Sequence, residues 1–209
     1  MNITWHGQTC FKIITQKNKE ASVEILIDPF EKETGLRPPK LGADILISTQ
    51  NKKIISGRDS FLITGPGEYD IKGVYIRGIP IADKNKKEER ATIFTIEVEE
   101  MKICHLGISA PKELTSRELE EVGNIDVLMI PTGGLDSLDA KEATKIMSQI
   151  EPKITIPMYY KVPGLKMKLD GLDKFLKPLG IKKLEPLTKL SVKKKDLVEK
   201  EAKIIVLTP

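Results

Sequence analysis

Histidine and cysteine, two of the residue types that bind zinc in proteins, are scarce in this sequence. Its 209 residues include two histidines and two cysteines, and aromatic residues make up 5% of the chain. Two cysteines are too few for a disulfide framework. Because Cys10 and Cys104 both lie among apolar residues, we expect free, buried thiols. A small disulfide-rich secreted fold is therefore excluded.

Long apolar runs are also missing. No run approaches the roughly 20 residues that a membrane-spanning helix needs, and the first residues contain no basic region followed by an apolar stretch. We therefore expect a cytoplasmic protein without a membrane partner. The net charge of +4 is small beside 34 basic and 30 acidic residues. This balance indicates a solvated surface and argues against nucleic acid as a partner.

The pattern of apolar residues predicts a mixed α/β fold in one domain, residues 1–209. The first half is rich in short strands and the second half alternates strands with helices, so two sheets covered by helices would bury the apolar runs. We expect a helix after the capping box at Thr115 and Glu118, and further helices at 139–150 and 169–179. The expected strands are 3–5, 10–15, 23–27, 44–48, 60–64, 68–71, 74–79, 92–98, 101–105, 127–130, 154–158, 189–192 and 203–207.

The loop after the apolar run 43–48 is the first place to look for chemistry, because loops at the ends of buried strands often carry it. Its sequence is Thr-Gln-Asn-Lys-Lys-Ile, residues 49–54. It offers hydroxyl, amide and ammonium groups, but neither imidazole nor carboxylate. Such a loop is poorly equipped to bind a metal.

A set of short motifs, weak singly but specific in their order and spacing, runs along nearly the whole chain. The motifs are Ile-Thr-Trp-His-Gly-Gln-Thr-Cys-Phe (3–11), Ile-Asp-Pro-Phe (27–30), Ala-Asp-Ile-Leu-Ile-Ser (43–48), Gly-Pro-Gly-Glu-Tyr (65–69), Cys-His-Leu-Gly (104–107), Ile-Asp-Val-Leu-Met-Ile-Pro-Thr-Gly-Gly (125–134) and Glu-Pro-Lys-Ile-Thr-Ile-Pro-Met-Tyr-Tyr (151–160). With them the chain resembles the metallo-β-lactamase-fold hydrolases, specifically the small zinc-dependent hydrolases of that fold. The resemblance implies a four-layer αββα sandwich with a metal site at the rim between the sheets.

The chain departs from that family where the family binds its metals. Thr49, Asn51, Lys53 and Ile54 stand where the resemblance implies three histidines and one aspartate. A further ligand histidine is replaced by Ala82, before Asp83; the bridging aspartate is replaced by Ile108, and the last histidine by Tyr159. Lys52 and Lys53 add positive charge where a dication would lie. We therefore expect no catalytic residue, no metal ligand and no cofactor, although zinc is the cofactor of the family. The expected vestigial pocket comprises Thr49, Asn51, Lys52, Lys53, Ala82, Asp83, His105, Ile108 and Tyr159.

Several polar residues have both a structural and a functional interpretation. We expect His105 and His6 to be structural histidines, Asp28 to shape the pocket wall, and Asp126 to cap or pair. A further hypothesis is that Lys52 or Lys53 replaces the charge of the metal against Asp83. Nucleophilic catalysis by Ser48 or Thr49 beside His105 has neither an orienting acid nor a nucleophile elbow to support it.

Three functions follow as hypotheses. The first is a catalytically inactive member of the fold that binds a small ligand or a protein partner. The alternative is an active metal-dependent hydrolase of phosphodiester or lactone bonds, with a site rebuilt from Asp83, His105 and Asp136. A second alternative is a nucleic-acid-binding module, which the lysine runs at 84–87 and 193–195 would serve. The sequence names neither the ligand nor the partner.

Overall fold

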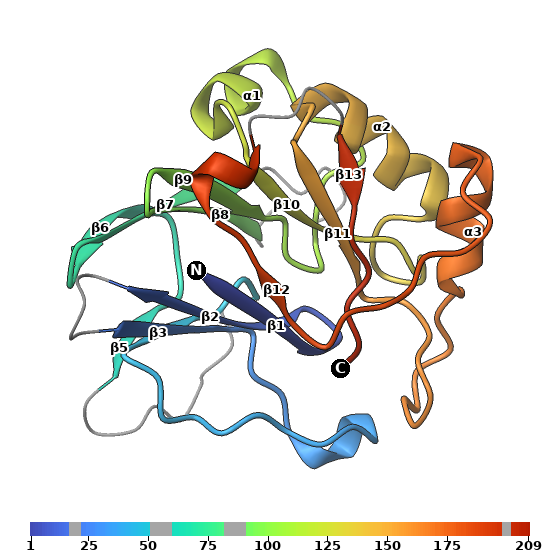
Figure 1. The fold of residues 1–209 in the computed structure, drawn as a ribbon, viewed down its shortest axis with the longest axis horizontal. Coiled ribbons are helices and arrows are strands. Elements are labelled where there is room, and N and C mark those ends of the chain that lie inside the picture. Colours follow the sequence, from blue (N-terminus) through green and yellow to red (C-terminus); the bar gives the residue numbers. More distant parts are fainter. Residues whose placement is uncertain (17–21, 51–59, 82–90, 198–201) are drawn as a thin grey trace.

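The computed structural model describes residues 1–16, 22–50, 60–81, 91–197 and 202–209. Two β-sheets face each other across an apolar core, and three α-helices cover the outer face of the larger sheet (Figure 1). The predicted mixed α/β sandwich is confirmed. It forms because the strands are apolar on at least one face, and each sheet must bury that face against another layer.

The smaller sheet has six strands in the order β12-β1-β2-β3-β4-β5. β1, β2 and β3 form an antiparallel meander, whereas β3, β4 and β5 run parallel and therefore end at one edge of the sheet. In β1, Ile3 and Trp5 are fully buried and alternate with half-buried polar residues, as a strand with one solvated face requires. The strands are β1 (Asn2–Gly7), β2 (Cys10–Gln16), β3 (Ser22–Ile27), β4 (Ile45–Ile47), β5 (Phe61–Ile63) and β12 (Leu190–Ser191).

The larger sheet has seven strands in the order β13-β11-β10-β9-β8-β7-β6. β6 to β9 are antiparallel, and β9, β10, β11 and β13 are parallel. All residues of β10 and β11 are buried, as expected for parallel strands covered on both faces. The strands are β6 (Gly67–Ile71), β7 (Val74–Ile81), β8 (Ala91–Val98), β9 (Met101–His105), β10 (Val127–Pro131), β11 (Ile154–Met158) and β13 (Lys203–Ile204).

The helices begin where the sequence places their caps. Thr115 caps α1 (Ser116–Val122) and Asp139 caps α2 (Ala140–Ile150), each in a complete capping box with a glutamate three residues later. The predicted helix at 169–179 is shorter than expected: α3 (Leu172–Leu176) passes into the 3-10 helix η2 (Lys177–Leu179). Pro178 lacks the N–H that would continue an α-helix, and the N–H of Asp170 donates to Gly133 O at 2.9 Å instead of entering a helix.

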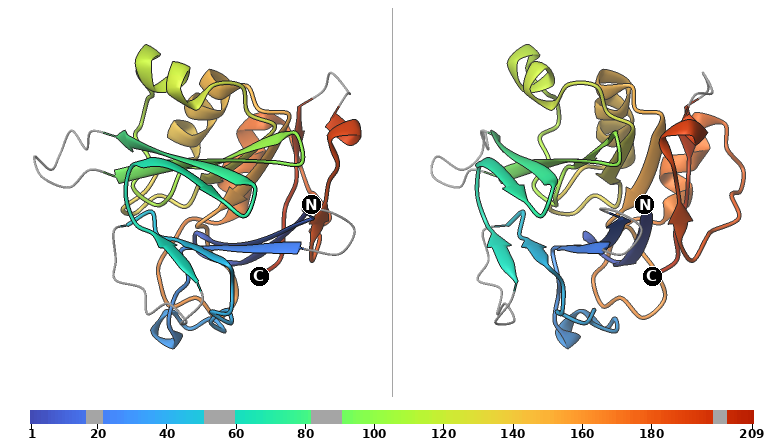
Figure 2. Two further views of the ribbon diagram at one scale, coloured as in Figure 1. Left: turned by 90° about the vertical axis from the view of Figure 1, so that its left-hand side faces the viewer. Right: turned by 60° about the vertical axis from the view of Figure 1, so that its left-hand side comes forward.

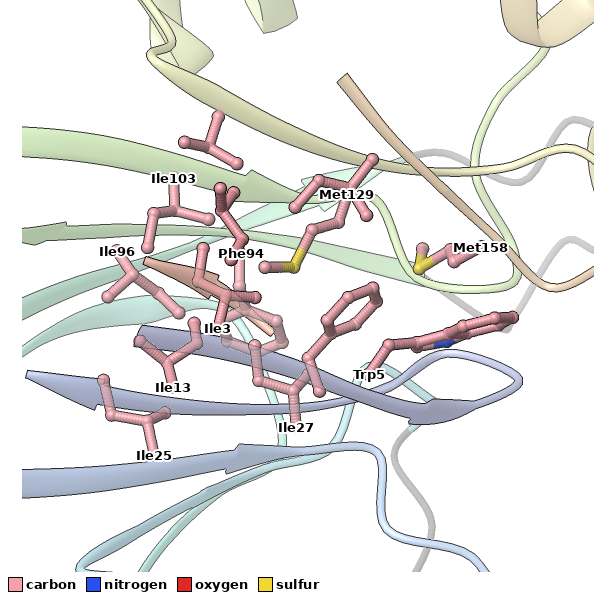
Figure 3. Close-up of a cluster of buried hydrophobic side chains, with 14 of the residues drawn as sticks. Ile3, Trp5, Ile13, Ile25, Ile27, Phe94, Ile96, Ile103, Met129 and Met158 are labelled. Carbon is pink, nitrogen blue, oxygen red and sulfur yellow. The ribbon is translucent and has the colours of Figure 1, made fainter. Parts of the chain in front are cut away.

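The core between the sheets is built from side chains of both inner faces (Figure 3). Aliphatic residues of β1 to β3 face Phe94, Ile96 and Ile103 of the larger sheet. Trp5 lies at one end of this core, and its ring centroid is 4.9 Å from that of Tyr160. Full burial of one such side chain stabilises a fold by about 1.5–3 kcal/mol. The core therefore fixes how the strand ends of the two sheets meet.

The outer face of the smaller sheet is covered differently. In the described part of the chain, α-helices lie over the larger sheet, and the segment 28–44 with the 3-10 helix η1 (Lys32–Thr34) runs below the smaller one (Figure 2). Phe30 packs there on Cys10, Leu26 and Leu46. Both cysteines are free and buried, as predicted. The third 3-10 helix is η3 (Lys194–Leu197), and no helix among the described residues is long and apolar enough to cross a membrane.

Candidate functional site

The ends of several strands from both sheets meet at one edge of the sandwich. Two contacts show this. A Cβ placed on Gly107, after β9, would lie 2.8 Å from the side chain of Thr49, after β4. The backbone N–H of Tyr159, after β11, donates to the carbonyl oxygen of Gln8 at 3.0 Å. We call this edge the strand-end site and define it by Asp28, Thr49, His105, Ile108, Asp136 and Tyr159. Loops at the carboxyl ends of parallel strands are where α/β-type folds place ligands.

Asp28 and Thr49 form the buried centre of this site. Asp28 follows β3 with a positive φ of 46°, and its carboxylate accepts hydrogen bonds from Thr49 N and from Thr49 Oγ1, both at 2.7 Å. Asp28 is 9% exposed, and both donors are neutral. No ion pair joins Asp28 to another residue within the described ranges. The site therefore contains a buried carboxylate whose charge no described cation balances.

His105 ends β9 and is fully buried. Its Nε2 lies 2.9 Å from Thr9 O and its Nδ1 accepts from Gly107 N at 3.1 Å, so Nε2 carries the proton. The ring meets Phe11 edge-on at 5.9 Å. Burial lowers the pKa of the imidazole, and the nearby carboxylate of Asp28 opposes this shift. Both ring nitrogens are engaged, which agrees with the structural interpretation and leaves neither nitrogen as a metal ligand or as a base for Ser48 or Thr49.

Tyr159 and Asp136 close the other side of the site. Tyr159 is 1% exposed, has a φ of 51°, and donates its hydroxyl hydrogen to Asp136 Oδ1 at 2.8 Å. Burial, and next the hydrogen bond to Asp136, raise the pKa of Tyr159 well above its ordinary value. The phenol therefore keeps its proton and acts as a neutral donor. Asp136, which the sequence placed in the rebuilt site with Asp83 and His105, lies on the turn after β10; its contact with Tyr159 was not predicted.

The other residues named from the sequence fall in different places. Ile108 is half-buried and packs against the core between the sheets. Six of the named residues lie outside the described ranges: Asn51, Lys52, Lys53, Ile54, Ala82 and Asp83. The hypothesis that a lysine pairs with Asp83 therefore concerns residues outside those ranges. Asp126 lies at the start of β10, where Lys194 and Lys153 approach its carboxylate to 3.0 and 3.2 Å. It pairs, as expected.

Two features of the site were not predicted from the sequence. The first is the hydrogen bonding between Asp28 and Thr49, which are 21 residues apart in the sequence. The pattern that could have predicted it is a polar residue at the end of each of two neighbouring parallel strands. The second is Gly107, whose φ of 68° and close approach to Thr49 exclude a side chain. Gly107 ends the motif Cys-His-Leu-Gly (104–107), which the sequence marked as part of the family resemblance, but its packing against Thr49 was not predicted.

A second hollow lies away from the strand-end site. It is a pocket of about 740 Å³ near Asp126, bordered by Lys102, Lys153 and Lys194. These lysines are already engaged: Lys102 pairs with Glu97 at 3.0 Å, and the other two pair with Asp126. The strand-end site is therefore the candidate functional site.

The burial of His105 predicts how stability depends on pH. Its pKa in the folded protein is lowered from about 6.5. As pH falls below 6.5, the unfolded chain binds a proton that the folded chain does not, so the free energy of unfolding decreases by up to about 1.4 kcal/mol per pH unit for each such proton. Urea unfolding between pH 8 and pH 5 should show this decrease, and His105→Gln should reduce its slope.

His6 provides the control for this measurement. Its pKa is also lowered, by burial and next by the charge of Lys12, but its ring lies outside the strand-end site on the other face of β1. His6→Gln should remove its own contribution and leave that of His105. Equal stability of the wild-type protein at pH 7 and pH 5 would contradict the assignment of a neutral buried imidazole.

Whether a metal fits the site depends on the donors present. Among the described residues no three His, Cys, Asp or Glu side chains come together. The whole sequence holds two histidines, and the nitrogens of His105 are engaged, so a zinc pair bound by several imidazoles does not fit. The buried, unbalanced carboxylate of Asp28 does fit a hard cation bound through oxygen. Asp136 is the other carboxylate among the residues that define the site.

The sequence and the fold are both similar to those of known proteins. Residues 2–159 match the profile of the β-lactamase superfamily domain. A proposed zinc-dependent hydrolase of the metallo-β-lactamase superfamily from Thermotoga maritima is 30% identical and superposes with a TM-score of 0.79 over 99% of this chain and 97% of that protein. A UPF0173 protein of Pyrococcus abyssi is 26% identical over 78% of this chain and 85% of its own length. A UPF0173 metal-dependent hydrolase of Thermococcus onnurineus is 26% identical over 77% of this chain and 84% of its own length.

These relatives correct one prediction. The expectation of no cofactor is wrong, because relatives across most of the chain are named metal-dependent hydrolases and the cofactor of the group is a metal. The expectation considered only the positions at which the family places its histidine and aspartate zinc ligands, whereas oxygen ligands at other positions can bind hard cations. The match to the superfamily profile covers well over half of the chain, and the Thermotoga maritima protein matches it end to end. This chain therefore belongs to the metallo-β-lactamase superfamily.

Proposed function

We propose that this protein is a metal-dependent hydrolase whose metal is bound through oxygen ligands at the strand-end site. The observation that carries the proposal is the carboxylate of Asp28, which is 9% exposed and accepts hydrogen bonds from the neutral donors of Thr49. A buried charge is costly unless it is paired or binds a metal. The names of the relatives support the metal-dependent hydrolysis itself.

The donors favour a hard cation over zinc. Carboxylate, hydroxyl and carbonyl oxygens suit Mg²⁺, Mn²⁺ and Ca²⁺, whereas zinc in proteins is held mainly by imidazole and thiolate. Asp28 is the described residue that would hold the cation, with Asp136 as a second carboxylate at the rim. Compared with the set proposed from the sequence, His105 is left out because both of its nitrogens are engaged.

The chain's own residues have separate tasks in this proposal. Thr49 holds the Asp28 carboxylate in one orientation through two hydrogen bonds, and Tyr159 holds Asp136 through one. When bound, a cation of this kind would lower the pKa of a bound water and polarise the bond to be hydrolysed. Phosphodiesters and lactones remain the proposed substrate bonds.

A second candidate function is the binding of a ligand or protein without turnover. A specific observation favours it: Thr49 donates to Asp28, Tyr159 donates to Asp136, and both ring nitrogens of His105 bond to backbone groups. Such mutual hydrogen bonding stabilises a fold without requiring a substrate. The proposed partner would then be a small molecule or a protein, with nucleic acid disfavoured by the small net charge.

Metal analysis combined with chelation separates the two candidates. Protein purified without chelator should contain a divalent metal near one equivalent and should hydrolyse bis(p-nitrophenyl) phosphate or a simple lactone. EDTA should abolish turnover, and Mn²⁺ or Mg²⁺ should restore it more fully than Zn²⁺. Protein without metal and without turnover at any added cation would contradict the hydrolase and support the binding function.

A further inference from the structure

The turn between β1 and β2 holds Gln8 in an unusual conformation. β1 ends at Gly7 and β2 begins at Cys10, and Gln8 between them has a φ of +50°. Glutamine is uncommon in this left-handed region, where glycine, asparagine and aspartate are preferred. Residues of this kind lower the stability of a fold and cluster at functional sites, because function can maintain what folding alone would not.

Backbone hydrogen bonds fix this turn within the strand-end site. The carbonyl oxygen of Gln8 accepts from Tyr159 N at 3.0 Å and from Trp5 Nε1 at 2.9 Å. The carbonyl oxygen of Thr9 lies 2.9 Å from Nε2 of His105, which donates to it. Tyr159 and His105 both belong to the strand-end site. The backbone of Gln8 and Thr9 is therefore part of that site, and moving it would break these hydrogen bonds.

The side-chain amide of Gln8 has a donor without an acceptor. Its Nε2 is buried and makes no hydrogen bond within the described part of the chain. A buried donor left in this state costs about 1–3 kcal/mol, so native structures retain few of them. Because the side chain is short and its backbone is bonded to Tyr159, this N–H group lies at the strand-end site. Gln8 thus combines backbone strain with an unsatisfied donor, and neither favours folding.

We infer that the side chain of Gln8 donates a hydrogen bond to an anionic oxygen of the ligand at the strand-end site. The inference rests on the proposed function in placing the ligand there. A carboxylate or a phosphoryl group supplies such an oxygen, and negative charge also develops on oxygen when a lactone or a phosphodiester is hydrolysed. A donor on a fixed backbone stabilises this charge without having to reorganise. Gln8 therefore contacts the reacting group and is a catalytic residue.

Gln8→Met tests the inference, because methionine keeps the length of the side chain and removes the donor. Inorganic phosphate is the probe, titrated by calorimetry into protein purified without chelator. The wild-type protein should bind phosphate, and Gln8→Met should bind it about tenfold more weakly, the loss expected for one hydrogen bond to a charged group. The thermal midpoint of the variant should stay the same or rise, since folding then buries no unsatisfied donor.

Gln149→Met is the matched control, because the amide of Gln149 is satisfied. Leu114 N donates to its Oε1 and its Nε2 donates to Leu114 O, both at 3.0 Å. Gln149 lies in the last turn of α2, next to residues that border the pocket near Asp126. The same substitution here should lower the thermal midpoint, because two hydrogen bonds are lost, and should leave phosphate binding unchanged.

The outcomes distinguish this inference from the proposed function. Absence of phosphate binding to the wild-type protein, equal affinity in Gln8→Met, or a lower thermal midpoint of this variant overturns the inference. Gln8-dependent binding in protein that shows no metal-dependent turnover supports the inference and contradicts the hydrolase. Metal-dependent turnover whose kcat is unchanged in Gln8→Met supports the hydrolase and overturns the inference.

Discussion

Replacing Asp28 with asparagine should abolish the stabilisation that a divalent cation gives this protein. Asparagine keeps the size of the side chain and can still accept from Thr49 N, but it carries no charge to bind a metal. A metal at about 100 times its dissociation constant stabilises a folded protein by about 2.7 kcal/mol. Thermal unfolding with and without Mn²⁺ should show this gain in the wild-type protein and not in Asp28→Asn, and metal-dependent turnover should fall at least about 100-fold.

Asp44→Asn is the matched control for this experiment. Asp44 lies at the opposite end of β4, where its carboxylate accepts from Glu24 N and pairs with Lys72 on the surface. Its loss should lower the free energy of unfolding by about 1 kcal/mol or less and leave the effect of the metal unchanged. If the two variants respond to Mn²⁺ alike, Asp28 does not hold the cation.

Gly133→Ala should cause the largest loss of stability among substitutions at the site. A Cβ on Gly133 would lie 2.2 Å from the carbonyl oxygen of Tyr159 and 3.0 Å from the Cα of Tyr160. Both are backbone atoms of the segment after β11, so relief requires the ends of β10 and β11 to separate. We expect a loss of about 3 kcal/mol or more, which lowers the thermal midpoint by about 6–12 °C in a chain of this size.

Gly42→Ala separates this clash from the general effect of replacing glycine. A Cβ on Gly42 would meet nothing within 4 Å. Its substitution should be neutral or stabilise the protein by up to about 1 kcal/mol through the unfolded state. A thermal midpoint of Gly133→Ala within 2 °C of the wild-type value would show that the strand ends move apart readily. In that case the strand-end site is not rigid.

Much of the fold could be predicted from local sequence. Alternating apolar residues in β1 and continuous apolar runs in β10 and β11 identified strands near their observed bounds, because burial on one or two faces leaves a direct pattern. The capping boxes of α1 and α2 fixed where those helices begin. The end of α3 was misjudged because Pro178 acts on backbone hydrogen bonds, which the apolar pattern does not report.

The site was predicted less completely. That Thr49 follows β4 and Tyr159 follows β11 was predicted from motif order along the chain. The hydrogen-bond partners of each side chain could not be predicted in this way, because they lie far apart in the sequence. His105 bonds to Thr9, 96 residues away, and Tyr159 bonds to Asp136 on the turn after another strand. The expectation of no cofactor came from the replacement of the family's histidine and aspartate ligands and from the charge of Lys52 and Lys53, without the buried carboxylate of Asp28.

By itself the sequence determined a two-sheet α/β sandwich, free cysteines and a supply of two histidines, since apolar periodicity and residue counts are local properties. Only the tertiary structure decided which polar groups meet at the strand ends. There the parallel strands bring Asp28 beside Thr49 and leave its charge buried without a cation among the described residues. That juxtaposition arises from packing two sheets face to face, and no stretch of the chain contains it.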